Sequence, residues 1–259
     1  MSKIIAITNQ KGGVGKTTTN INLATCLAQA GKRVLVVDMD PQGNSTSGFG
    51  VDKYNLQQSV YNLLIGEASL EEVIIPVCAE GVRLLPANID LSGAEIELIA
   101  MAEREYRLKS IFNRSRYLFD YILIDCPPSL NLLTLNALCA ADSVMIPIQC
   151  EYFALEGLSQ LMNTIQRVQQ KLNPRLVIEG VVFTMYDGRT NLSNQVVDEV
   201  KKHLGAHTYE SIIPRNVRLS EAPSHGLPIT LYAADSKGAD AYRSLAHEVI
   251  SKNQGQGAR

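Results

Sequence analysis

Short apolar runs alternate with longer stretches of helical periodicity along the whole chain. Six short apolar runs are typical of buried strands, at 3–8, 33–38, 82–87, 121–125, 142–150 and 176–187. Apolar residues recur at helical spacing at 16–30, 59–64, 94–112 and 155–172. Strands that alternate with helices in this way predict an α/β fold: a mostly parallel, twisted sheet with helices on both faces.

The stretch between the first strand and the first helix is rich in glycine and reads NQKGGVGKTT, residues 9–18. Gly12, Gly13 and Gly15 allow main-chain N–H groups to approach phosphate oxygens, and the following helix adds the positive end of its dipole. Lys16 suits the β- and γ-phosphates, and the Thr17 hydroxyl suits magnesium. The spacing therefore predicts a P-loop that holds ATP and Mg²⁺ through Gly12, Gly13, Val14, Gly15, Lys16, Thr17 and Thr18.

Two acidic residues follow predicted strands at the edge where the P-loop is expected. Asp40 comes just after the run 33–38, and Asp125 ends the run 121–125. Ligands of open parallel sheets bind at the carboxyl ends of the strands. Asp40 can hold the attacking water or the outer shell of the metal, although Asp40-Pro41 is also a common turn start. Asp125 resembles a Walker B carboxylate that contacts magnesium through water.

Composition favours one domain, which we place at 1–252, followed by a flexible tail at 253–259. The chain has 259 residues, of which 46% are hydrophobic, enough for one large core. It shows no signal-peptide pattern and no apolar run of about 18 residues, so we expect a cytoplasmic protein without a membrane anchor. The five cysteines are scattered, and we expect reduced, buried thiols rather than disulfides or a zinc site.

The net charge of −2 gives no overall attraction to nucleic acid. Residues 163–218 differ, because they carry eight Lys or Arg against five Asp or Glu, a net charge of +3. Any DNA-binding patch is therefore expected in this later part. Residues 51–118 contain no pattern that we can assign to chemistry.

The P-loop departs from the standard pattern in one informative way. Gln10 stands where the first glycine would fall, and Lys11 precedes the glycine pair. The resulting K-G-G-x-G-K-[ST] box resembles the deviant Walker A box of the ParA/MinD family of P-loop ATPases. That resemblance implies that Lys11 reaches across a dimer interface to the partner's nucleotide, and that Asp40 in D-x-D-P-Q is needed for hydrolysis. The alternative for Lys11 is a solvated loop lysine.

The segment 212–229, IIPRNVRLSEAPSHGLPI, narrows the resemblance to the chromosome-partitioning ParA or Soj branch. In that branch the Pro and Asn of I-P-R-N lie against the adenine, which implies these roles for Pro214 and Asn216. The resemblance also places Arg189 and Arg218 on a DNA-binding surface formed by two ATP-bound subunits. The alternative for each arginine is an exposed side chain or a surface ion pair.

The function implied is an ATP-dependent homodimeric switch on the nucleoid. The ATP dimer would bind nonspecific double-stranded DNA, and slow hydrolysis, stimulated by a ParB or Spo0J-type centromere-binding partner, would release it. The cycle would partition chromosomes or plasmids. Chromosomal relatives further suggest a replication initiator as a partner.

Three alternatives remain open on the sequence. A MinD-like positioning ATPase shares the Lys11 box but needs a C-terminal amphipathic helix, and no apolar face follows Lys252. An iron–sulfur ATPase needs cysteines paired at the dimer axis. Cys126 lies close to the connection at Pro127 and Pro128, which would sense the γ-phosphate as a second switch. A metabolic P-loop ligase would use ATP with a small substrate and would not bind DNA.

Overall fold

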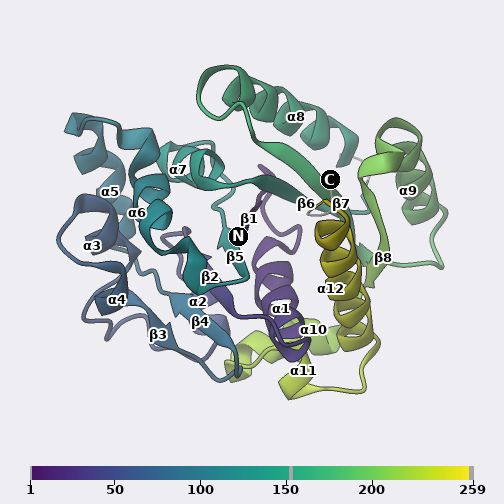
Figure 1. Cartoon of the computed structure of the whole chain (residues 1–259). Coiled ribbons are helices and arrows are strands. Elements are labelled where there is room, and N and C mark those ends of the chain that lie inside the picture. Colours follow the sequence, from purple (N-terminus) through teal and green to yellow (C-terminus); the bar gives the residue numbers. More distant parts are fainter. Residues whose placement is uncertain (1, 152–153, 257–259) are drawn as a thin grey trace.

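The computed structural model describes residues 2–151 and 154–256. One twisted eight-stranded sheet runs through these residues (Figure 1), in the strand order β3-β4-β2-β5-β1-β6-β7-β8. The pairs from β4 to β8 are parallel, and β3 alone pairs antiparallel with its neighbour. The strands are β1 Lys3–Ile7, β2 Val34–Asp38, β3 Ile75–Pro76, β4 Val82–Leu85, β5 Tyr121–Asp125, β6 Ser143–Gln149, β7 Val177–Tyr186 and β8 Thr208–Pro214.

Helices cover both faces of the sheet, as the sequence predicts. The α-helices are α1 Lys16–Gln29, α2 Asn44–Gly48, α3 Val60–Ile65, α4 Leu70–Val73, α5 Leu91–Glu97, α6 Arg107–Ser115, α7 Leu132–Ala140, α8 Ala154–Lys171, α9 Asn191–Leu204, α10 Val217–Glu221, α11 Ile229–Tyr232 and α12 Lys237–Gln256. Short 3-10 helices are η1 Leu98–Ala100, η2 Arg104–Tyr106, η3 Arg116–Leu118, η4 Gly205–His207 and η5 Ala222–His225.

Alternation along the central strands divides the core into two layers. In β1, Ile4 and Ala6 pack into one cluster with residues of α3 and α5 to α9, whereas Ile5 and Ile7 pack into the other with α1 and α10 to α12. These strands are buried on both faces and therefore read as continuous apolar runs in the sequence. Full burial of both clusters makes the sheet a rigid support for its carboxyl-end loops.

The helix predicted at 94–112 is wrong, because the chain there breaks into α5, η1, η2 and α6. Glu103 adopts a left-handed conformation with φ 52°. Asn136 on α7 stabilises the break: its Nδ2 donates to the carbonyl of Arg104 at 2.8 Å, and its Oδ1 accepts from the Leu108 N–H at 3.2 Å. A tertiary contact thus overrides the helical periodicity of the segment.

The predicted flexible tail at 253–259 is wrong in its first part, because α12 continues to Gln256. Nδ2 of Asn253 donates to Oε1 of Glu179 on β7 at 2.9 Å, and Nζ of Lys252 lies 3.9 Å from the ring centroid of Tyr209. These contacts fasten the helix end to the sheet. Residues 257–259 lie outside the described residues.

Candidate nucleotide-binding site

The glycine-rich loop connects the carboxyl end of β1 to the start of α1. Gly13 and Gly15 have φ of 74° and 85°, so the loop needs glycine at both positions. Buried Asn9 fixes the loop start: its Oδ1 accepts from the Lys11 N–H at 3.0 Å, and its Nδ2 donates to the Pro147 carbonyl at 2.8 Å. The loop therefore presents the N-terminus of α1, beginning at Lys16, toward the strand ends.

Lys16 is buried among the groups that would surround a phosphate. Lys16 is only 7% exposed, and its Nζ donates to the Lys11 carbonyl at 3.3 Å. Burial lowers the pKa of Lys16, while the carboxylates of Asp125 and Asp40 act in the opposite direction. A cation held this way favours an anionic ligand, because the ligand's charge offsets the loss of hydration.

The carboxyl ends of β2, β5 and β1 lie side by side, and the register places Asp38, Asp125 and Ile7 next to one another. Asp38 and Asp125 are both buried. Burial raises the pKa of Asp125 to about 7, and the nearby charge of Asp38 adds to the effect. Burial likewise raises the pKa of Asp38 to about 6, against hydrogen bonds from Thr46.

The two buried carboxyls differ in how their oxygens are used. Asp38 is held internally, since its Oδ2 accepts from the N–H and the hydroxyl of Thr46, each at 2.8 Å. Asp125 accepts from the Ser45 hydroxyl through Oδ2 at 2.8 Å, and its buried Oδ1 has no hydrogen-bond partner among the described residues. The hydroxyl of Thr17 also faces this carboxyl and counters the rise in its pKa. Thr17 and Asp125 thus meet as hard oxygen donors that fit Mg²⁺.

Asp40 reaches the same site and also forms the turn that its sequence allows. Its carbonyl accepts from the Gly43 N–H at 2.8 Å, and its Oδ1 accepts from the Gln42 N–H at 2.9 Å. The residue is 9% exposed, and its carboxylate acts on Lys16, Asp38 and Asp125. Both interpretations of Asp40 are compatible with this geometry.

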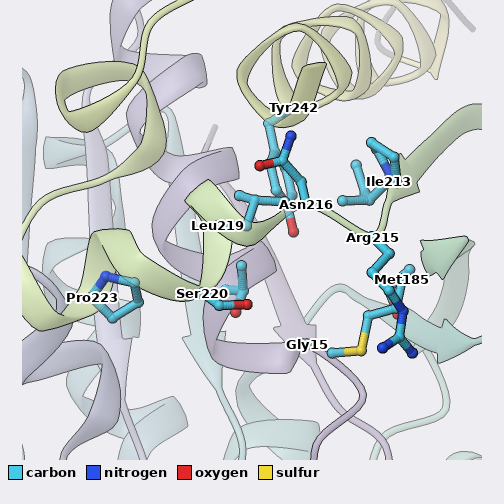
Figure 2. Close-up of a pocket in the computed structure, with 12 residues that line it drawn as sticks. Gly15, Met185, Ile213, Arg215, Asn216, Leu219, Ser220, Pro223 and Tyr242 are labelled. Carbon is cyan, nitrogen blue, oxygen red and sulfur yellow. The ribbon is translucent and has the colours of Figure 1, made fainter. Parts of the chain in front are cut away.

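A cavity of about 270 Å³ adjoins the glycine loop (Figure 2). Gly15 and Thr18 line it from the loop side, and Pro214 at the end of β8 and Asn216 just after β8 line it from the other side. The Oδ1 of Asn216 caps α10 by accepting from the Arg218 N–H at 2.8 Å, which leaves the amide nitrogen for other partners. The structure therefore brings both predicted adenine-contact residues together with the loop.

Sequence reasoning missed several residues of this site. Thr184, at the carboxyl end of β7, donates its hydroxyl proton to the Val14 carbonyl at 2.8 Å, and Met185 and Tyr242 line the cavity. Met185 has φ 50°, a left-handed conformation rare for such a side chain. Among the missed residues, only Asp38 could have been found from the sequence, because it ends an apolar run two residues before Asp40.

The predicted cross-dimer lysine, Lys11, and the predicted DNA-binding arginines, Arg189 and Arg218, form ion pairs within the chain. Nζ of Lys11 lies 2.7 Å from Oε2 of Glu151. Arg189 and Arg218 are exposed after β7 and on α10, and they pair with Asp187 at 2.7 Å and Glu221 at 2.9 Å. The structure thus gives each predicted DNA-binding arginine an acidic neighbour, the arrangement described by the surface-ion-pair alternative.

Comparison with known proteins identifies the family. The family model described as an AAA domain matches residues 2–178. The sporulation initiation inhibitor protein Soj of Bacillus subtilis (strain 168) is 59% identical over 97% of this chain and 99% of its own length. The chromosome-partitioning protein ParA of Caulobacter vibrioides (strain NA1000 / CB15N) is 52% identical over 99% and 97%. The chain belongs to the family of Soj and ParA chromosome-partitioning ATPases.

A solved structure confirms the P-loop NTPase fold for this ParA-family chain. A protein of Mycobacterium smegmatis named cobyrinic acid a,c-diamide synthase, with bound ADP and magnesium, superimposes with a TM-score of 0.85. It is 40% identical, and the match covers 100% of this chain and 97% of that one. Among residues 2–151 and 154–256, no helix has the length and apolarity to cross a membrane.

The cysteines bear on the iron–sulfur alternative. Cys26, Cys126, Cys139 and Cys150 are buried, as expected, whereas Cys78 is exposed, which corrects that part of the expectation. Burial raises the pKa of the Cys126 thiol, and its side chain faces the Ile124 carbonyl inside the core. Cys126 is therefore poorly placed to hold a cluster at the surface of the chain.

Proposed function

We propose that this ParA-family chain binds ATP with Mg²⁺, dimerises, binds nonspecific double-stranded DNA as the ATP dimer, and is released by hydrolysis to partition chromosomes or plasmids. The observation that carries the proposal is the meeting of buried Lys16 with Asp125, whose Oδ1 lacks a partner among the described residues, at the glycine loop. A phosphate and its cation satisfy both groups together.

In this mechanism each residue has a distinct task. Glycine-loop amides and Lys16 hold the phosphates, and Thr17 and Asp125 hold Mg²⁺, which neutralises phosphate charge when bound. Asp40 holds the attacking water, while Pro214 and Asn216 contact the adenine. Lys11 leaves Glu151 and reaches the nucleotide of the partner subunit, where a cation stabilises transition-state charge. A ParB or Spo0J-type protein accelerates the otherwise slow turnover.

DNA binding follows from the dimer. Two-fold pairing doubles the number of arginines that face the DNA. Each phosphate contact releases counterions, and these contributions add, so a dimer binds DNA at salt concentrations at which a monomer does not bind. Nothing in the described residues resembles a recognition helix, and binding is therefore independent of sequence. Nucleoid localisation and contact with a replication initiator are further proposals from the same family membership.

The deciding experiment measures binding to a random-sequence duplex at low salt with ATP, with ADP and without nucleotide, while sedimentation gives the oligomeric state of the same samples. We expect DNA binding and dimerisation to occur together only with ATP. ATP-dependent dimers that do not bind the duplex would overturn the proposed DNA binding. If those dimers bind lipid vesicles instead, a MinD-like role would replace it.

A second candidate, a small-molecule ligase, is favoured by the name of the Mycobacterium smegmatis structure. The higher identity to Soj, 59% against 40%, makes it the weaker candidate. A ligase would turn over ATP only with a carboxylic acid substrate and an amine donor. Turnover stimulated by DNA and a ParB-type partner, with cobyrinic acid and glutamine without effect, would exclude it.

A further inference from the structure

The segment from Tyr61 to Glu105 carries an unusual charge. It contains nine acidic residues and two basic ones, a net charge of −7, whereas the whole chain carries −2. Among these carboxylates only Glu105 has a cationic partner within 4 Å in the described residues. The segment lies on the β3-β4 side of the sheet and includes α3, α4, α5 and η1. This surface therefore attracts cations and repels a second copy of itself.

Exposed isoleucines run through the middle of that surface. Ile89, Ile96 and Ile99 are 65%, 75% and 63% exposed. At about 100° per residue these positions fall within an arc of about 80°, so they form one stripe about 15 Å long on α5, η1 and the turn before α5. We call these three residues the isoleucine stripe.

The inward face of the same helical segment is also apolar. Leu91, Ala94 and Leu98 are buried, and α5 packs beside α3 at the left of Figure 1. A helix that is apolar on two opposite faces is expected to be covered on both. Carboxylates flank the outward stripe, with Glu95 on one side and Asp90 and Glu97 on the other.

We propose that the isoleucine stripe and its flanking carboxylates are the docking site for a basic amphipathic helix of a partner protein. The apolar face of that helix, about three turns long, covers the stripe, and its Lys or Arg residues face Asp90, Glu95 and Glu97. Pairing with a second copy is disfavoured, because it would bring two surfaces of charge −7 together.

The site is connected to the nucleotide through one side chain. Nδ2 of Asn131 donates to Oε1 of Glu95, and Oδ1 of Asn131 caps α7 by accepting from the Thr134 N–H at 3.1 Å. Asn131 lies in the connection that follows Asp125, so a helix that engages Glu95 acts on a side chain already hydrogen-bonded to that connection. The effect of docking on turnover rests on the proposed function, whereas docking itself does not.

The test uses the full chain and a defined probe, an 18-residue peptide of Leu and Lys with helical periodicity, followed by fluorescence anisotropy. A peptide of the same pattern with Glu in place of Lys is the charge control. We expect the Lys peptide to bind and the Glu peptide not to bind. Ile96→Ser/Ile99→Ser should weaken binding of the Lys peptide at least tenfold, whereas Val177→Ser, at another exposed apolar residue, should not.

Asp90→Asn/Glu97→Gln should weaken the same binding and flatten its salt dependence, compared with Asp198→Asn/Asp235→Asn, two exposed carboxylates outside the 61–105 segment. Unchanged affinity in the isoleucine variant, or equal binding of both peptides, would overturn the proposal. So would a nucleotide-free dimer that the isoleucine variant dissociates. ATP-dependent DNA binding without peptide should stay at the wild-type level in the isoleucine variant. Its absence from the wild type would overturn the proposed function and leave docking intact.

Discussion

Nζ of Lys11 lies 2.7 Å from Oε2 of Glu151 within a single chain. The side chains are 36% and 45% exposed, so the pair is partly solvated. In the proposed dimer Lys11 contacts the partner's nucleotide and cannot also hold Glu151. The intrachain pair therefore competes with dimerisation.

Glu151→Gln should strengthen ATP-dependent dimerisation, because it removes the competing carboxylate. An exposed pair of this kind contributes about 0.2–1 kcal/mol. Two such pairs break when a dimer forms, so their removal corresponds to a dissociation constant lower by about 2- to 30-fold. Sedimentation in an Asp40→Ala background, where ATP persists, measures the change. Asp120→Asn, which breaks the Arg33 pair, is the control. A dimer weakened by Glu151→Gln would show that the carboxylate belongs to the interface instead.

Asp40→Ala should preserve ATP-dependent dimers and lower phosphate release by at least about 100-fold, because the attacking water loses its carboxylate. Asp40→Asn separates the two interpretations of this residue. Asparagine keeps an acceptor for the Gln42 N–H, so a residue needed only for the turn would tolerate it. We expect Asn to be as inactive as Ala in a phosphate-release assay, while Asp52→Ala stays normal. Normal turnover by Asp40→Asn would remove the carboxylate from the mechanism.

Much of this site could be predicted because its parts are local in sequence. The glycine loop, Lys16 and Thr17 are contiguous, and Asp40 and Asp125 each follow an apolar run. The neighbourhood of Asp38 and Asp125 depends on β2 pairing with β5, which joins residues 87 positions apart. No local pattern encodes that register. Residue spacing in the sequence therefore did not predict that the carboxyls of Asp38 and Asp125 lie next to each other.

The same limit explains the errors in the fold. Helical spacing at 94–112 is real, but Asn136 on a distant helix stabilises the break. The polar end of α12 reads as a tail, yet Glu179 on β7 holds Asn253. Strand β8 was not predicted at 208–214, because the segment 212–229 was interpreted only as a family motif. Contacts between distant segments decide these cases.

The buried carboxyls give the nucleotide-free protein a pH-dependent stability. Burial raises the pKa of Asp38 to about 6 and of Asp125 to about 7, above the ordinary value of about 3.9. The folded chain thus keeps protons that the unfolded chain has lost. The resulting stabilisation is full below about pH 4 and is lost as the pH rises through about 6 to 7.

We therefore expect the free energy of unfolding to fall between about pH 4 and pH 7, by up to about 1.4 kcal/mol per pH unit for each proton. Urea unfolding at constant ionic strength measures the slope. Asp125→Asn should flatten it, and Asp142→Asn, at the opposite end of the sheet, should not. Equal slopes in the wild type and Asp125→Asn would show that these carboxyls do not titrate as a buried pair.

Lys16→Ala should lower ATP affinity by about 10- to 150-fold, because a charge-assisted hydrogen bond to phosphate contributes about 1.5–3 kcal/mol. Isothermal titration with ATP and Mg²⁺ measures the affinity. Lys171→Ala, an exposed lysine at the end of α8, is the control. Unchanged ATP affinity in Lys16→Ala would contradict the assignment of the phosphate site.

Arg189→Ala and Arg218→Ala should each weaken DNA binding by the ATP dimer without changing ATP affinity. Each arginine contacts phosphate once per subunit, so each substitution removes two contacts from the dimer. The slope of log affinity against log salt should therefore become shallower by about 1.8 per substitution. Titration of a random-sequence duplex at several salt concentrations gives that slope.

Arg33→Ala is the matched control for the arginines. Arg33 is similarly exposed and ion-paired, with Asp120 at 3.2 Å, but it lies at the amino ends of the strands. Its substitution should leave the salt slope unchanged. Asp187→Asn adds a positive test, because it releases Arg189 from its partner and should tighten DNA binding. If neither Asp187→Asn nor Arg189→Ala changes DNA binding, the pair is only a surface ion pair and the DNA binds elsewhere.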